Sequence, residues 1–229
     1  MAHIFFSADK FFGATNLIQK FTLLYKILKS GNTSYYAKNG RCVGIMEYSF
    51  NVYNRMATTG LVLSLGRLIK PQQRPVILCI GSDLAIGDSL GPVCGTMLLK
   101  KKYCDLFVYG TLKKTITAKE IKYMNDFLHE THPGCPVIAI DAAVGDAGDI
   151  GLIRVTNNGI RPGLGANKRL GKVGDIGILG IVAEKSVFNY SLLNLTRLNL
   201  VYRMADIISD AVADFSARSL FGETGEVAV

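Results

Sequence analysis

Short apolar runs alternate with helical patterns along most of the chain. Runs that are apolar throughout indicate strands buried on both faces; they are 76–81, 106–110, 136–142, 150–156 and 176–183. Apolar residues at helical spacing predict helices over 51–70, 90–102, from 121 onward and 191–215. Buried strands with interleaved helices predict an α/β fold, a three-layer sandwich in which helices cover both faces of a largely parallel sheet.

The first 45 residues have a different pattern. Segment 16–29 places apolar residues at helical spacing with lysines towards the other side, and a turn-rich patch follows it. This leader is a basic amphipathic helix that contacts a membrane or partner, an ordinary helix packed on the domain, a disordered segment, or the product of a start site placed before Met46. The predicted organisation is a leader over 1–45, a helix and linker over 46–74, and one domain over 75–229.

Composition narrows the class of protein. The 229 residues are 49% hydrophobic, which predicts a folded domain rather than a disordered chain. No apolar run approaches the ~18 to 20 residues of a membrane span, and no signal peptide opens the chain, so we expect a cytoplasmic protein. The five cysteines lack metal-type spacing and predict reduced thiols.

The formal net charge of +8 is unevenly distributed. Six lysines and arginines against one acid lie in residues 1–45, so that the remaining chain has an ordinary charge. We therefore expect no nucleic-acid partner for the domain.

Two aspartates follow predicted strands at the positions where α/β sheets form their sites. Asp88, in "GDSLGP", lies after strand 76–81 near the start of the next helix, and Asp141, in "AIDAA", ends strand 136–142. Sites in such sheets lie beyond the carboxyl ends of the strands. If the two strands are neighbours, both carboxylates face one crevice.

A pair of close carboxylates shares a proton, because two negative charges repel each other. Such a pair can act as general base and general acid, or bind a divalent metal through oxygen. The structural alternatives are a helix cap for Asp88 and a turn acid bonded to its own backbone for Asp141. Spacing alone leaves both interpretations open.

A glycine-rich basic stretch, "NNGIRPGLGANKR" over 157–169, is a third candidate. Its exposed N–H groups and its basic residues Arg161, Lys168 and Arg169 suit a carboxylate, a phosphate or a peptide backbone. Composition alone favours a long irregular connection.

Five stretches together resemble the YyaC family of sporulation proteins, over about residues 75–215. They are "VILCIGSDLAIGDSLGPVCGTML", "VYGTL", "PVIAIDAAVG", "GIRPGLGANKRLGKVGDIGILGIV" and "NLTRLNLVYRMADII". "GDSLGP", "VIAIDA" and "GIRPGLGANKR" more distantly resemble the spore germination protease, which degrades small acid-soluble spore proteins. The fold so implied is that of hydrogenase-maturation peptidases.

The resemblance implies roles for these residues. The two catalytic aspartates of the germination protease fall on Asp88 and Asp141, and Arg161, Lys168 and Arg169 would position a peptide. Hydrogenase-maturation peptidases add a later histidine that helps to hold a metal, whereas this chain has no histidine beyond His132. We therefore expect no metal and no cofactor, and a peptide or small spore protein as substrate.

Three functions stay open at this point. The first is a sporulation-associated peptidase with a paired-aspartate site. The second is a non-catalytic protein that binds a peptide or partner during spore formation, and the third, a metal-dependent hydrolase, has only two visible ligands. The oligomeric state is not predicted.

Overall fold

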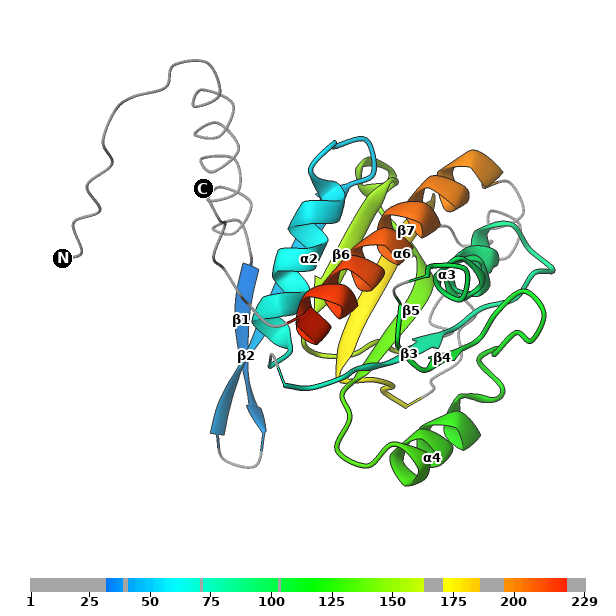
Figure 1. Cartoon of the computed structure of the whole chain (residues 1–229). Helices are drawn as coiled ribbons and strands as arrows, with labels where there is room; N and C mark the ends of the chain where they lie inside the picture. Colours follow the sequence, from blue (N-terminus) through cyan, green and yellow to red (C-terminus); the bar gives the residue numbers. More distant parts are fainter. Residues whose placement is uncertain are drawn as a thin grey trace, which may run out of the picture.

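A seven-stranded sheet lies at the centre of the molecule, seen here in a computed structural model (Figure 1). The structure describes residues 32–38, 41–70, 72–102, 104–162, 171–185 and 196–221. Across the sheet the strand order is β1-β2-β6-β7-β5-β3-β4. The strand bounds are β1 Asn32–Lys38, β2 Arg41–Asn51, β3 Val76–Cys79, β4 Val108–Tyr109, β5 Val137–Gly145, β6 Leu152–Thr156 and β7 Ile176–Glu184.

One half of the sheet is parallel. Strand β3 pairs in parallel with β4 and β5, and β5 pairs in parallel with β7. Every residue of β3 and the first five residues of β5 are buried. These are the apolar runs from which the sequence predicted strands covered on both faces.

The other half of the sheet is antiparallel. Strand β6 pairs antiparallel with both β7 and β2. Only a short connection that contains the turn η2 (Ala147–Asp149) separates β5 from β6. A parallel crossover needs about a dozen residues or more, so β6 has to run in the opposite direction. The sheet is therefore mixed, and its parallel half carries both predicted aspartates.

Helices cover both faces of this sheet. Their bounds are α2 Ala57–Leu68, α3 Leu90–Leu98, α4 Ile121–Thr131 and α6 Leu198–Phe221. Helices α2, α3 and α6 share one apolar core with the sheet and lie together across one face in Figure 1. Helix α4 packs on the other face through Ile121, Met124 and Leu128. The predicted three-layer α/β sandwich is confirmed, and none of the described helices is long and apolar enough to cross a membrane.

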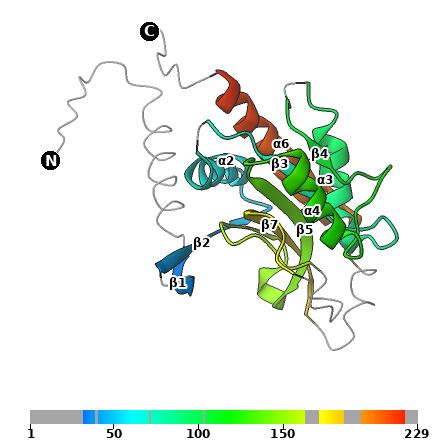
Figure 2. The same cartoon turned by 90° about the horizontal axis from the view of Figure 1, so that it is seen from below.

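The hairpin formed by β1 and β2 was not predicted. The two strands pair in antiparallel register from Asn32↔Glu47 to Lys38↔Arg41, where the sequence indicated a turn-rich patch. Figure 2 shows the hairpin at the edge of the molecule away from β4. The predicted boundary between residues 45 and 46 falls inside β2, and the predicted leader helix over 16–29 lies outside the described residues.

Candidate functional site

Asp88 is held at the carboxyl end of β3 by a tight loop. Gly81 has a φ of +141°, and a Cβ atom there would lie 2.1 Å from the carbonyl oxygen of Asp88. Only glycine allows this approach. The backbone N–H of Ser82 donates to the same carbonyl at 3.1 Å and closes the loop. Asp88 itself lies in the short turn η1 (Gly87–Ser89), which leads into α3.

A second glycine brings α3 against the end of β3. A Cβ atom on Gly91 would lie 2.1 Å from the carbonyl oxygen of Ile80. The first turn of α3 therefore contacts the backbone of the strand directly. This contact fixes the position of η1, and with it Asp88, relative to the sheet.

Asp141 lies on β5, the neighbour of β3. The last residue of β3, Cys79, pairs with Ile140, so Asp141 is the next residue of β5 beyond that pairing. Its side chain is largely withdrawn from solvent, since the residue is only 7% exposed. The Ala142 backbone N–H donates a hydrogen bond to Oδ1 of Asp141 at 2.8 Å.

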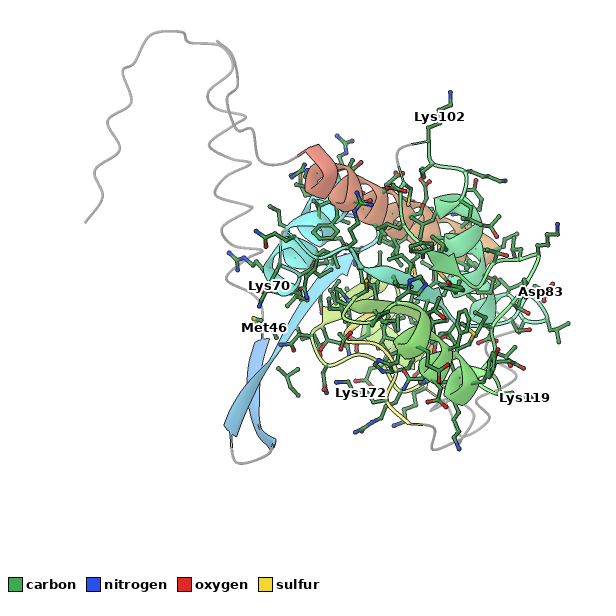
Figure 3. All side chains as sticks on the ribbon, turned by 60° about the horizontal axis from the view of Figure 1, so that its bottom comes forward. Met46, Lys70, Asp83, Lys102, Lys119 and Lys172 are labelled. Carbon is green, nitrogen blue, oxygen red and sulfur yellow. The ribbon has the colours of Figure 1, made fainter. Side chains whose placement is uncertain are left out.

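Asp141 lies one residue beyond the level at which β3 ends, where the loop that carries Asp88 begins. The two strands are neighbours, as the sequence prediction required, but β5 continues to Gly145 and does not end at Asp141. The exposed Asp83, which lies in the same loop as Asp88, is labelled in Figure 3. It lies on the side of the molecule opposite Met46 and Lys70.

Burial and mutual repulsion set the protonation of the pair. Burial raises the pKa of Asp88 to about 6, and a hydrogen bond from the Ser82 backbone N–H acts in the opposite direction. Burial also raises the pKa of Asp141 well above its usual range, and the negative charge of Asp88 raises it further, while the Ala142 N–H lowers it. The two carboxyl groups therefore interact, and the more buried Asp141 is the harder of the two to ionise.

An ionised and a protonated carboxyl group side by side can perform acid–base chemistry. The carboxylate can take a proton from water, and the protonated partner can give one to a leaving group. As metal ligands the two aspartates offer oxygen atoms only, which suit magnesium or manganese. No group of three or more histidine, cysteine, aspartate or glutamate side chains that could hold a metal occurs in the part of the chain that the structure describes.

Of the three basic loop residues, the structure describes Arg161, and it does not bring Arg161 to this pair. Arg161 is exposed and follows Ile160, whose backbone pairs with Val173 ahead of the start of β7. Asp141 pairs with Leu179, further along β7. Lys168 and Arg169 lie outside the described residues. Their predicted role in positioning a peptide stays a prediction.

Two features of the site had no signal in the sequence. The backbone N–H groups of Ser82 and Ala142 lower the pKa values of the aspartates, but every residue except proline carries such a donor. The loop that carries Asp88 also exposes Leu84 (91%) and Ile86 (38%) to solvent. Their position could not be inferred from composition, since apolar residues are usually core residues.

Comparisons with known proteins place the chain in a family. Residues 49–211 match a family model described as "Protein of unknown function (DUF1256)", a range that includes both aspartates. The chain is also 37% identical over 138 residues to "Uncharacterized protein YyaC" of Bacillus subtilis (strain 168), which covers 60% of this chain and 67% of that protein. This chain therefore belongs to the YyaC family, as the resemblance of its motifs indicated.

Proposed function

We propose that this protein is a sporulation-associated peptidase that hydrolyses peptide bonds with Asp88 and Asp141. The observation that carries the proposal is the pair itself, two interacting carboxyl groups with raised pKa values at the carboxyl edge of β3, with Asp88 in the loop and Asp141 on the parallel neighbour β5. Strongly raised pKa values at such an edge are typical of catalytic acids and bases.

The mechanism assigns one task to each carboxyl group. Ionised Asp88 takes a proton from a water molecule, which attacks the carbonyl carbon of the scissile peptide bond. Protonated Asp141 then gives its proton to the leaving amine. The different burial of the two groups supports this division, because the more buried acid has the higher pKa and gives up its proton less readily.

The substrate class follows from the resemblance to the spore germination protease. We propose a peptide or a small spore protein as substrate, and the cytoplasm of the sporulating cell or forespore as the place of action. The motifs "GDSLGP" and "VIAIDA", which carry the two aspartates, support this proposal.

The test is cleavage of small acid-soluble spore proteins by the purified full-length chain, with the fragments resolved by mass spectrometry. We expect discrete fragments with the wild type and none with Asp88→Asn or Asp141→Asn. Asp83→Asn is the matched control, because Asp83 lies in the same loop but is exposed. A wild type that cuts neither spore proteins nor an unfolded protein such as casein would sink the peptidase proposal.

A second candidate function is binding of a peptide or partner without turnover. The exposed Leu84 and Ile86 favour it, because apolar side chains exposed beside a site suit a protein partner. A wild type that retains spore proteins in a pull-down and cuts none of them would support this second function.

A further inference from the structure

The last strand of the sheet, β4, borders an open groove with a volume of about 510 Å³. Val108 and Tyr109 of β4 line its floor. One wall comes from Leu99 at the end of α3, and the other comes from Tyr123 and Phe127 of α4. Since α3 and α4 lie on opposite faces of the sheet, the groove lies where one more strand would continue the sheet between two helical layers.

The floor of this groove offers backbone hydrogen-bonding groups. The Ile77 N–H donates to the Phe107 carbonyl at 2.8 Å, and Val108 lies opposite Ile77 in the parallel ladder. In this pattern the N–H and C=O groups of Val108 point away from β3. Strand β4 ends the strand order, so none of the strands in the described ranges pairs with these groups.

The size and lining of the groove fit a short extended segment. A residue of a strand between covering layers occupies about 160 Å³, from a rise of ~3.4 Å, a strand spacing of ~4.8 Å and a layer spacing of ~10 Å. The groove therefore holds about three residues. Tyr123 and Leu99 are 69% and 63% exposed, so an occupant with apolar side chains would cover both.

The lining of the groove contains one basic and one acidic side chain, Lys114 and Glu120. None of the ion pairs formed within the described residues involves Lys114. The carboxylate of Glu120, which also lines the groove, accepts a hydrogen bond from the Thr117 N–H at 2.9 Å. Lys114 is thus available to an acidic group of the occupant, whereas Glu120 is engaged within the chain.

We propose that this groove binds an extended peptide with apolar side chains and an acidic residue, which adds to β4 as a further strand and pairs with Lys114. That the peptide is the substrate rests on the proposed function. The groove adjoins the site, because the carbonyl of Ile116, another lining residue, accepts the Gly81 N–H at 2.9 Å. Gly81 begins the loop that carries Asp88.

The test measures binding in the full-length Asp141→Asn chain, which cannot turn the probe over. The probe is a capped five-residue peptide of alternating valine and aspartate with a fluorescein label, followed by fluorescence anisotropy. Val108→Pro removes an outward N–H without affecting the bonds to β3, and Lys114→Glu replaces the basic side chain of the groove by an acidic one. We expect each to weaken binding by about tenfold or more.

Two controls separate the groove from general effects. Lys70→Glu makes the same charge change at the far side of the molecule (Figure 3) and is expected to change binding by less than about twofold. A probe methylated on its backbone nitrogens, or one with lysine in place of aspartate, is expected to bind about tenfold more weakly to the unaltered groove. The modified probes keep the test decisive even if Val108→Pro does not fold.

Several results would overturn this proposal: no binding of the probe, equal weakening by Lys70→Glu and Lys114→Glu, or a wild-type dimer that Val108→Pro separates into monomers. The last result would make a second copy of the chain the occupant. Cleavage of spore proteins without probe binding rejects the groove and leaves the aspartate pair in place. Probe binding that follows the expected pattern without any cleavage supports the groove and rejects the peptidase.

Discussion

At the scale of single residues, the mutual repulsion of Asp88 and Asp141 costs the fold stability at neutral pH. Asparagine keeps the shape of aspartate but carries no charge. We therefore expect Asp88→Asn and Asp141→Asn each to abolish peptidase activity and to leave the free energy of unfolding equal or higher by up to about 1 kcal/mol. Urea unfolding and the cleavage assay on one preparation of each variant check this prediction.

The opposite result has a clear meaning. A carboxylate that caps a helix or closes a turn stabilises the fold, and its loss costs about 0.5 to 2 kcal/mol. If both variants lose stability in this range and the wild type cleaves nothing, the aspartates have structural roles.

The raised pKa values also predict how stability depends on pH. A carboxyl group with a raised pKa in the folded state binds its proton more tightly there than in the unfolded chain. Its stabilising contribution is complete below the unfolded pKa of about 4 and is lost as the pH rises through the folded pKa. The stabilising contribution of Asp88 is lost as the pH rises through its pKa of about 6. That of Asp141 is lost at higher pH.

We therefore expect Asp141→Asn to gain stability relative to the wild type as the pH rises from 5 to 8. Urea unfolding of both proteins across this range measures the difference, in which other titrating groups cancel. A wild type that becomes more stable than the variant with rising pH would show that the carboxylate of Asp141 is favoured by the fold.

The oxygen-only ligand set predicts weak metal binding. Two carboxylates give an affinity too low to survive dialysis, and they prefer magnesium or manganese to nickel or zinc. We expect elemental analysis of the dialysed protein to find less than about 0.1 transition-metal ion per chain. One tightly held ion per chain, retained in Asp83→Asn and lost in Asp88→Asn, would contradict this expectation.

At this scale the sequence located the pair but not its surroundings. Asp88 and Asp141 could be predicted because each follows a fully apolar run, although β5 continues beyond Asp141 to Gly145 and it is the shorter β3 that ends at this level. The degree of burial of Asp141 depends on what covers it, which a local pattern does not contain. Arg161 illustrates the same limit, since its place beside the start of β7 depends on the long-range pairing of Ile160 with Val173.

At the scale of elements, glycines decide how closely helices approach the sheet. A methyl group on Gly91 would overlap the Ile80 carbonyl, so α3 would have to move away from β3. We expect Gly91→Ala to cost about 1 to 3 kcal/mol of stability and to lower activity by displacing η1.

Gly66→Ala is the matched control on α2. Gly66 is exposed, and a Cβ atom there meets nothing within 4 Å. This variant should be more stable by about 0.5 to 1 kcal/mol, because alanine favours a helix over glycine. Urea unfolding distinguishes the two variants, and equal effects would mean that α3 does not depend on the close contact.

Sequence reasoning missed the β1–β2 hairpin although its pairing is local, from Asn32↔Glu47 to Lys38↔Arg41. The fully apolar runs predicted β3, β5 and β7, because burial on both faces leaves a local pattern. Strand β1 has no such pattern and is held by β2. The direction of β6 was contained in the sequence, since the residues between 145 and 152 are too few for a crossover.

At the scale of the whole molecule, the position of β2 bears on the predicted domain boundary. The β2–β6 ladder runs from Glu47↔Thr156 to Asn51↔Leu152, so a chain that starts at Met46 keeps all of it. It loses β1 and the hydrogen bond from Asn157 Nδ2 to the Gly44 carbonyl at 3.0 Å. We expect this shorter chain to keep the unfolding free energy of the full chain within about 1 kcal/mol, as measured by thermal or urea unfolding.

A loss larger than about 2 kcal/mol would show that residues before Met46 pack on the core. Asn157→Ala in the full chain keeps the hairpin but removes both hydrogen bonds of this side chain, from Nδ2 to the Gly44 carbonyl and from the Met46 N–H to Oδ1. The two measurements together separate the contribution of the hairpin from that of the Asn157 side chain.

The pairing of β2 with β6 also has a consequence for how the chain is made. Glu47 pairs with Thr156, so β2 leaves the ribosome more than a hundred residues before its partner. At a synthesis rate of about 5 to 20 residues per second, β2 waits roughly 5 to 20 s for β6. During that interval β1 can already pair with β2, and the hairpin then blocks one edge of a strand that would otherwise expose both to other nascent chains.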